Sequence, residues 1–286
     1  MTENPPTRRE RTIKPRRIRF RYPVETYRHH YANDDLVLSH AVAFLSAVFP
    51  PGEDFFIRSV KHFRADITDP ELFDQVAGFI GQELTHGREH RELNDRLQDM
   101  GYPTHNADRA VTWVFARIDQ LLSPLTRLSF TAALEHYTAT VAEILLTDPK
   151  AQALLGETEV RTMLLWHAYE ESEHKSVAFD VYRAMGGGER RRVWGMRLVT
   201  AGFIIGVILG TAVSLVRDRA AYNPIRLIRS ALKLRHLPFI DRRMWRLIGE
   251  YNRPGFHPTD TDNAALLERW RTELFGDQGA LTPYLR

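Results

Sequence analysis

The chain of 286 residues contains no cysteine. This absence excludes disulfide bonds, thiolate zinc sites, iron–sulfur clusters and a cysteine nucleophile. Any metal site must therefore be built from histidine, aspartate and glutamate. The start of the sequence is polar and basic, and it lacks the apolar core of a secretory signal. We therefore expect a cytoplasmic protein.

Alternating strand patterns and internal repeats are also missing. Apolar residues recur at helical spacing instead, which predicts an all-α fold. Helical patterning begins near Asp34, and Pro50-Pro51-Gly52 is expected to interrupt it before a second helix starts. Further helices are expected over residues 70–99, 107–121, 124–146, 157–184, 190–217, 221–236, 240–251 and 262–275, with a short one from Pro149.

The small net charge of +3 conceals a strong segregation of charge along the chain. Residues 1–30 carry +6, residues 186–246 carry +10, and the remainder carries −13. We expect a basic N-terminal arm (1–29) that is flexible or loosely docked over residues 1–22, a bundle (30–186) and a helical C-terminal extension (187–286). Nucleic acid is not an expected partner, because the second basic region surrounds a long apolar run.

Two of the expected helices carry a Glu-x-x-His motif, and two others carry an inward-facing glutamate. Residues three positions apart share one face of a helix, so each motif points two ligands the same way. The order along the chain is Glu53, Glu83-x-x-His86, Glu135 and Glu171-x-x-His174. Ferritin-like di-iron carboxylate proteins have this arrangement, with one Glu from each of two helices and a Glu-x-x-His from each of the others. We therefore expect a ferritin-like four-helix bundle that binds two metal ions.

The residue types suit this chemistry. Four carboxylates balance the charge of two divalent ions, and two imidazoles add nitrogen ligands that suit iron, manganese or zinc. Without metal, the carboxylates would repel one another and resist burial. We expect iron, and an enzyme that uses O₂ to oxidise a small apolar or lipid-like substrate. The sequence identifies neither the electron donor nor the oligomeric state.

Two further histidines lie one helical turn from the motifs. His167 precedes Glu171 by four residues, and His90 follows His86 by four. His167 is either an additional ligand or a hydrogen-bond partner of one, whereas His90 is expected to be a partner or a surface residue. With a third histidine, the ligand pattern resembles that of p-aminobenzoate N-oxygenase, a di-iron enzyme.

Some neighbouring residues allow alternative assignments. Glu170 or Glu173 could replace Glu171 as a ligand, although the spacing favours Glu171. Asp180 and Arg58 are expected to hydrogen-bond to the ligands. Surface salt bridges would explain both of them equally well.

Several longer stretches carry a wider resemblance. The sequence resembles a bacterial family described as predicted metal-dependent hydrolases, over most of the chain after about residue 17. That resemblance implies an alternative function, in which a two-metal enzyme hydrolyses its substrate with a metal-bound water. The matching stretches are "FPPGEDFFIRSVKHF", "FIGQELTHGREH", "ALEHYTA", "WHAYEESEHKSVAFDVY" and "YNRPGFHPTDTD".

Residues 198–216 form an apolar run of 19 residues without a charge, flanked by Arg197 and Arg217. The run is just long enough to span a bilayer, and it contains small residues four positions apart. Three interpretations stay open: a membrane span, partial contact with a membrane, and burial in the core or along an apolar channel. The flanking basic residues suit an anionic membrane surface, so peripheral attachment at the inner face of the membrane is one expectation.

Overall fold

The computed structural model describes residues 13–22, 28–156 and 158–285. Within these ranges the regular structure is helical, apart from one antiparallel bridge between Ile18 and Leu285. The predicted all-α fold is confirmed. The α-helices are α1 (Leu36–Lys61), α2 (Pro70–Asp99), α3 (Thr104–Leu121), α4 (Pro124–Thr147), α5 (Pro149–Ala153), α6 (Glu159–His174), α7 (Val177–Ala184), α8 (Glu189–Leu215), α9 (Pro224–Leu234), α10 (Arg242–Glu250) and α11 (Ala264–Phe275).

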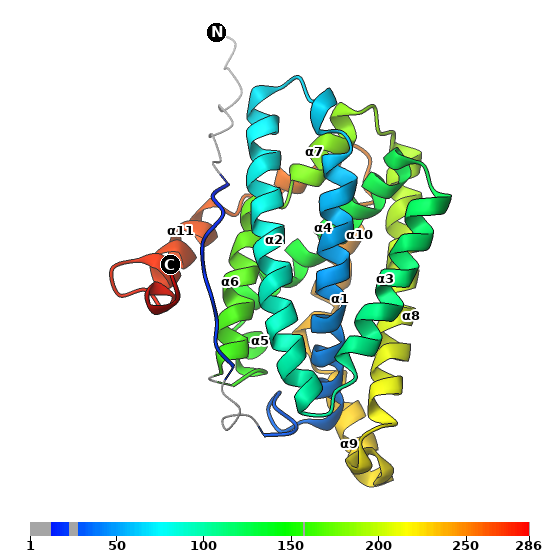
Figure 1. The fold of residues 1–286 in the computed structure, drawn as a ribbon, viewed down its shortest axis with the longest axis vertical. Helices are drawn as coiled ribbons and strands as arrows, with labels where there is room; N and C mark the ends of the chain where they lie inside the picture. The colour runs from blue at the N-terminus through cyan, green and yellow to red at the C-terminus, as the bar shows by residue number, and fades with distance from the viewer. Residues whose placement is uncertain (1–12, 23–27, 157, 286) are drawn as a thin grey trace.

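The long helices form a bundle in which α1, α2, α3 and α8 run roughly along the long axis of the molecule (Figure 1). Helix α1 packs against α2, α3 and α8, and helix α4 packs against α6 and α8. Short 3₁₀ turns complete the connections, at Arg64–Asp66, Arg219–Tyr222, Pro238–Ile240, Pro258–Asp260 and Thr282–Tyr284.

Helix α1 continues through Pro50 and Pro51, so the expected interruption at this point is wrong. A proline at position 50 removes the N–H that would bond to the carbonyl of Ser46. The side chain of Asn94 on α2 supplies the missing donor, because its Nδ2 lies 3.0 Å from Ser46 O. A contact between two helices therefore satisfies the carbonyl that proline leaves free, and the single helix places Glu53 inside the bundle.

The single helix expected over residues 157–184 is divided into α6 and α7, so that expectation is also wrong in part. Helix α6 ends at His174 and α7 begins at Val177. The amide of Asn263 donates to the carbonyl of Ser172 at 2.9 Å, where the helical N–H of Ser176 would otherwise bond. The chain therefore turns immediately after the second Glu-x-x-His motif.

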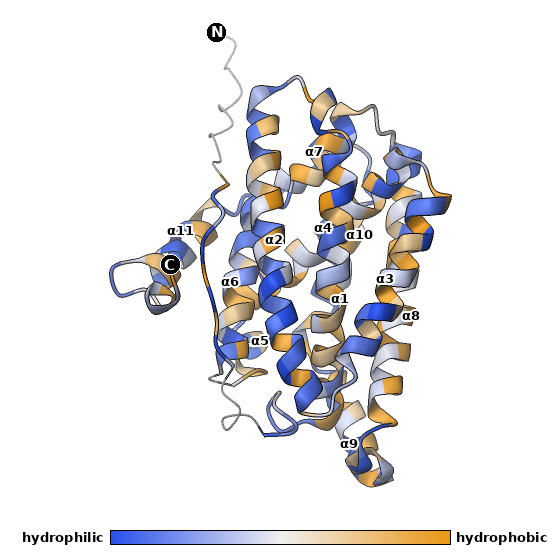
Figure 2. Ribbon diagram, viewed as in Figure 1, coloured by the Kyte–Doolittle hydropathy of each residue, from blue (hydrophilic) through white to orange (hydrophobic). Residues whose placement is uncertain are grey.

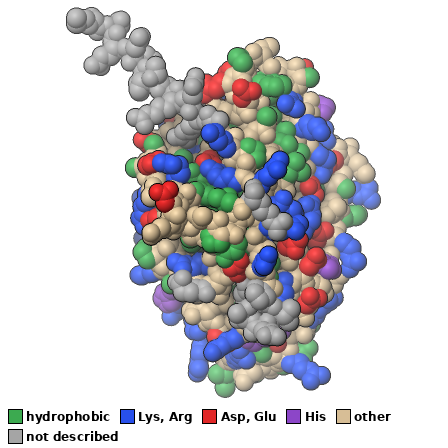
Figure 3. Space-filling view, turned by 60° about the vertical axis from the view of Figure 1, so that its left-hand side comes forward, with side chains coloured by type: hydrophobic (Ala, Val, Ile, Leu, Met, Phe, Trp, Pro, Cys, Tyr) green, Lys and Arg blue, Asp and Glu red, His purple; other side chains and the backbone are tan. Residues whose placement is uncertain are grey.

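Residues 13–22 form an extended segment that docks tightly along α2 and α6. Ile18 and Phe20 are buried, and Phe20 N donates to Glu89 Oε2 at 2.9 Å. The expected flexible or loosely docked arm is therefore wrong for these residues, whereas residues 1–12 lie outside the described part. The face that carries this segment shows basic, acidic and apolar side chains intermixed (Figure 3).

Helix α8 packs against α1 and α4 along one side only. Most of the remaining surface of its uncharged run is apolar and exposed, and Figure 2 shows the lower part of α8 in orange and white, as hydrophobic or neutral. Within the described residues two stretches are long and apolar enough to cross a membrane: Leu36–Asp66, which is mostly buried, and α8, which is mostly not. Burial of residues 198–216 in the core, one part of the third interpretation above, is therefore wrong. The other part, a helix that lines an apolar channel, stays a prediction. The buried residues of α8 are Arg192, Gly195, Met196, Val199, Thr211 and Ser214.

Candidate metal centre

The bundle brings the carboxylates and imidazoles of four helices into one buried cluster. Two groups of three side chains have ligand atoms that all lie within 4.8 Å of one another and could each hold a metal ion. The first group comes from α1, α2 and α6, and the second from α2 and α6. The groups are Glu53, His86 and His167, and Glu83, Glu171 and His174.

Glu53 faces α2 at a position where that helix has no side chain. A Cβ added to Gly87 would lie only 2.9 Å from Glu53 Oε2. Glycine therefore lets the carboxylate approach the backbone of α2 closely. On the other side, Glu53 Oε1 lies 3.8 Å from Nε2 of His167.

The second group is built around Nε2 of His174. This nitrogen lies 3.2 Å from Glu83 Oε1, 3.6 Å from Glu171 Oε2 and 3.5 Å from Glu135 Oε2. Glu135 of α4 therefore joins the cluster, as its position in the sequence predicts. The four carboxylates come from four different helices, α1, α2, α4 and α6.

Two carboxylates connect the groups. Glu83 Oε1 lies 3.7 Å from Nδ1 of His86 as well as beside His174. Glu171 Oε1 lies 2.8 Å from Nε2 of His167, and its other oxygen lies on the His174 side. The two groups are therefore adjacent, and Glu83 and Glu171 lie between them.

The strongest sign of a ligand is a set of buried polar atoms without hydrogen-bond partners. Buried polar atoms nearly always have a partner, and each exception costs free energy. Nine such atoms lie together in this one cluster, and all nine are of types that bind metal. Among the described residues, the cluster atoms without a hydrogen bond are both carboxylate oxygens of Glu53, Glu83 and Glu135, together with Glu171 Oε2, His86 Nδ1 and His174 Nε2. The residues present therefore fit metal ions.

In each motif histidine, the ring nitrogen that faces away from the cluster contacts a side chain outside it. Nε2 of His86 lies 3.0 Å from Glu170 Oε2, and Nδ1 of His174 lies 2.8 Å from Gln82 Oε1. When the imidazole is neutral, each acceptor selects the tautomer whose other nitrogen is unprotonated, and that nitrogen faces the cluster. The structure thus places Glu171 among the four carboxylates, and Glu170 behind His86.

Arg16 of the N-terminal segment completes this outer layer. Its guanidinium donates to Glu170 at 2.8 Å and to Glu173 at 2.6 Å. Glu173 in turn accepts a hydrogen bond from Gln82 Nε2 at 2.8 Å. Sequence analysis missed the roles of Arg16, Gln82 and Glu170. The only signal available was that Gln82 lies four residues before His86, on the face of the motif.

His167 and His90 form a hydrogen-bonded pair. Nε2 of His90 lies 2.9 Å from Nδ1 of His167, and Nδ1 of His90 lies 2.9 Å from Ser46 Oγ. His90 therefore contacts His167 and not the carboxylates, whereas Nε2 of His167 faces Glu171. Burial lowers the pKa of both rings, and the neighbouring imidazoles lower it further.

The structure places the other two expected partners away from these groups. Arg58 is half exposed, and its Nη2 donates to Asp119 of α3 at 2.9 Å. Asp180 Oδ1 lies 2.8 Å from Nε2 of His257, in the turn after α10. Both residues therefore make ion pairs with partners outside the carboxylate cluster.

A third group, which the sequence did not suggest, consists of His29, His30 and Asp218. Asp218 Oδ2 lies 2.8 Å from Nε2 of His30 and 3.1 Å from Nε2 of His40. Arg226 also places a guanidinium nitrogen 2.8 Å from Nδ1 of His30. These atoms have hydrogen-bond partners, unlike the unpaired ligand atoms of the carboxylate cluster. The group links the start of α1 to the end of α8.

The carboxylates of the cluster differ in their affinity for protons. Burial raises the pKa of Glu53 and of Glu135 well above the ordinary value, and the charges of Glu83 and Glu171 raise it further. Burial acts in the same direction on Glu83 and Glu171, but the adjacent histidine side chains outweigh it and lower their pKa values. Without metal, Glu53 and Glu135 therefore bind protons more readily than Glu83 and Glu171 do.

Burial disfavours the charged form of both motif histidines, but the carboxylates beside them favour it. The carboxylates of Glu170 and Glu83 raise the pKa of His86 to about 10. Those of Glu171 and Glu83 likewise raise the pKa of His174. Metal-free, the cluster thus favours protons at the positions where divalent ions would neutralise the same carboxylates.

Comparison with known families identifies one match. A family model described as "predicted metal-dependent hydrolase" matches residues 14–262, which include the whole cluster and the docked N-terminal segment from Lys14 onward. Searches of curated proteins and of solved structures found no match.

Proposed function

The chain belongs to the family of predicted metal-dependent hydrolases, and from this premise we propose that it is an enzyme with two metal ions in the bundle. The unpaired buried ligand atoms of the cluster are the observation that carries this proposal. Glu53, His86 and His167 would hold one ion, and Glu135 and His174 would help to hold the other. Glu83 and Glu171, which lie between the two positions, would supply ligands to both.

For the reaction we propose hydrolysis of an ester, amide or phosphate bond, in agreement with the family description. Bound divalent ions act as Lewis acids and lower the pKa of water, which makes it a nucleophile near neutral pH. The protein holds the ligands in fixed positions, because Glu170 and Gln82 orient the two motif imidazoles. It also excludes bulk water, since the cluster side chains are almost completely buried.

A second candidate is the oxidation of an apolar substrate with O₂. The complete burial of the cluster favours it, because a small apolar gas reaches such a site more easily than a polar ester does. The ligand set of four carboxylates and two or three imidazoles also suits iron. The electron donor for this reaction is unspecified.

An apolar groove supports the proposal of an apolar substrate for either reaction. It has a volume of about 360 Å³, lies between α3 and α8, and reaches α1 at Ala43 and Phe44. Helix α1 also carries Glu53, so the groove and the cluster share one helix. Its outer walls are Ala107, Ala110, Val111 and Val114 on α3 and Gly206, Leu209, Gly210 and Val213 on α8.

Isotope labelling distinguishes the two reactions. The protein is purified without metal, loaded anaerobically with Fe(II), Mn(II) or Zn(II), and assayed against esters, amides and phosphate esters with apolar chains. Hydrolysis places ¹⁸O from labelled water in the product and proceeds without O₂, whereas oxygenation takes the label from ¹⁸O₂ and requires Fe(II). An absorption band that develops only when the Fe(II) protein meets O₂ would favour the second candidate.

The control variant is Glu143→Gln on α4, whose carboxylate pairs with Arg243 at the surface. It should behave like the wild type, whereas Glu135→Gln on the same helix should lose activity. Failure to bind any of the three metals would reject both reactions.

A further inference from the structure

The exposed apolar surface of this protein is concentrated in one region of the chain. Among the large hydrophobic side chains that are exposed in the described part, 14 of 20 lie between Trp194 and Trp245. Scattered single hydrophobic residues are normal on a soluble protein, but a continuous apolar patch marks an interaction site. Helices α8 and α9 carry most of it.

Helix α8 presents the longer part of this patch. Ile205, Ile208, Leu209 and Val213 are each more than half exposed. They belong to the uncharged run 198–216, which extends for about 28 Å at the rise of an α-helix. That length is close to the thickness of the hydrocarbon layer of a bilayer.

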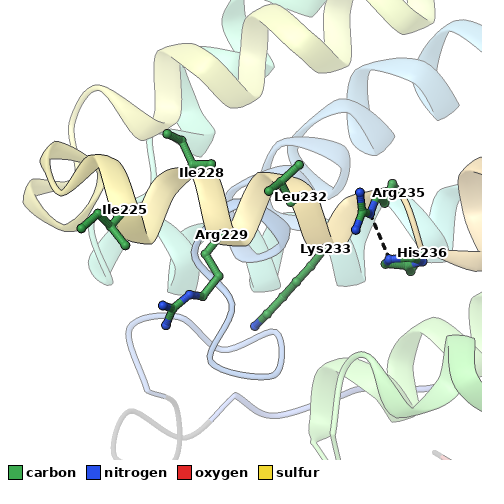
Figure 4. Close-up of a pocket in the computed structure, with 7 residues that line it drawn as sticks. All are labelled: Ile225, Ile228, Arg229, Leu232, Lys233, Arg235 and His236. Carbon is green, nitrogen blue, oxygen red and sulfur yellow. Dashed lines mark hydrogen bonds between the residues drawn. The ribbon is translucent and has the colours of Figure 1, made fainter.

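Helix α9 is amphipathic and extends the patch. Ile225, Ile228 and Leu232 are more than half exposed and line a shallow open pocket with Arg229 and Lys233. Figure 4 shows Ile228 and Leu232 projecting from one side of α9, and Arg229 and Lys233 projecting from the opposite side. A short helix with exposed isoleucines and arginines suits the boundary between acyl chains and headgroups.

Charge and aromatic residues at the ends of the patch point to the same partner. Residues 219–240 carry five Lys or Arg and no Asp or Glu. Trp194 and Tyr222, which are 60% and 69% exposed, lie just outside the two ends of the uncharged run. Tryptophan and tyrosine prefer the interfacial layers of a bilayer, and basic residues prefer anionic headgroups.

We propose that the exposed face of α8 and α9, residues 194–232, binds the surface of a membrane that contains anionic lipids. A membrane suits this face better than a second copy of the chain, because the basic and aromatic residues at the ends of the apolar run match the headgroup layers of a bilayer. The attachment is peripheral, because the opposite side of α8 packs on α1 and α4, and the neighbouring helix α3 carries exposed Arg109 and Arg117. This inference does not depend on the reaction that the metal centre catalyses.

Co-sedimentation with vesicles tests the proposal. The full chain should bind vesicles of phosphatidylcholine mixed with phosphatidylglycerol, bind vesicles of phosphatidylcholine alone far less, and be released partly by high salt. The double variant Arg219→Glu/Arg229→Glu should bind at least about 30-fold more weakly, from about 1 kcal/mol for each basic residue near the surface. Arg109→Glu/Arg117→Glu on α3 makes the same change in charge and should bind like the wild type.

Fluorescence quenching by brominated lipids provides a test that does not depend on charge reversal. Trp194 on α8 and Trp113 on α3 are equally exposed, each at 60%. Quenching should fall in Trp194→Phe and stay unchanged in Trp113→Phe. Equal quenching in both variants, or no binding to anionic vesicles, would overturn the proposal. A lipid-free dimer that Ile225→Asp/Ile228→Asp converts to a monomer would also overturn it, in favour of a second copy.

Discussion

Nε2 of His86 lies 3.0 Å from Oε2 of Glu170, although the two residues are 84 positions apart in the sequence. This contact turns the other ring nitrogen, Nδ1, toward Glu83 and Glu171. Glu170 itself is fixed by Arg16, which comes from the extended N-terminal segment. The orientation of a proposed metal ligand therefore depends on a chain of contacts that begins outside the four helices of the cluster.

Replacing Glu170 by Gln should weaken metal binding by about 10–100-fold without changing the number of ions, because the amide holds the ring of His86 less firmly. Competition with a chelator measures the affinity, and metal analysis at saturation gives the number of ions. The control is Glu143→Gln, which removes a surface charge from α4. A Glu170→Gln protein that binds one ion fewer would make Glu170 a ligand, contrary to the arrangement described above.

Replacing Glu135 by Ala should reduce the metal content of the loaded protein from about two ions per chain to one or none. Glu135 is the only carboxylate that α4 contributes to the cluster, and its two oxygens have no hydrogen bond among the described residues. Elemental analysis after desalting measures the content, and Glu143→Ala is the matched control. Retention of two ions would contradict the assignment of Glu135.

His167 and His90 should respond differently to replacement. His167→Ala removes an imidazole whose Nε2 faces Glu171 and Glu53, so it should change the absorption spectrum of the Fe(II) protein after exposure to O₂. His90→Ala removes the ring that hydrogen-bonds to Nδ1 of His167. This variant should leave the spectrum nearly unchanged and lower the metal affinity about 10–100-fold. If both variants lower the metal affinity equally and neither changes the absorption spectrum, then His167 does not bind metal.

Metal binding should release protons, and affinity should increase with pH. In the metal-free protein, the raised pKa values favour the protonated forms of His86, His174, Glu53 and Glu135. Metal ligands must be deprotonated, so each ion displaces protons. Calorimetry in two buffers with different ionisation enthalpies measures the number of protons released. A heat that does not depend on the buffer would contradict this prediction.

The same shifts determine how the metal-free fold responds to pH. The pKa of His86 is raised from its ordinary value of 6.5 to about 10. Its contribution to stability is therefore fully present below pH 6.5 and is lost as the pH rises through about 10. Thermal melting of the metal-free protein should thus shift to lower temperature at alkaline pH, whereas the loaded protein should shift less.

Replacing Arg16 by Ala should destabilise the protein by up to about 3–5 kcal/mol, because the fully buried Glu170 then keeps only His86 as a charged partner. Urea unfolding of the metal-free protein measures the change. The control is Arg269→Ala, which breaks an exposed pair with Glu273 and should cost less than about 1 kcal/mol. Equal effects of the two variants would show that the N-terminal segment contributes little to the bundle.

Local regularities of the sequence were sufficient to predict the helices and to group the cluster residues. The three-residue spacing of Glu83 and His86, and of Glu171 and His174, places each pair on one helical face regardless of what surrounds it. Hydrophobic periodicity likewise predicted the positions of the helices, since each helix buries a stripe of its own residues. The absence of cysteine restricted any metal site to oxygen and nitrogen ligands.

Contacts between distant segments decided the rest. The amide of Asn94 allows α1 to continue through Pro50, and the amide of Asn263 accompanies the end of α6 near His174. The local sequence around Pro50 or His174 could not reveal either asparagine, because Asn94 and Asn263 lie far from these positions in the chain. The docking of Arg16 on Glu170, and the choice of Glu171 over Glu170 for the cluster, arise in the same way.

For the apolar run 198–216 too, the sequence determined one property and the tertiary structure decided another. Its composition makes it a helix that avoids water, but composition is identical for a buried helix and for a lipid-facing one. Only packing shows that α8 has neighbours on one side, and that its other side stays exposed beside the basic helix α9. The sequence by itself determined which residues are apolar and which can bind metal, because these are properties of single side chains. The tertiary structure decided which of them face one another, because that depends on contacts between segments that are distant in the chain.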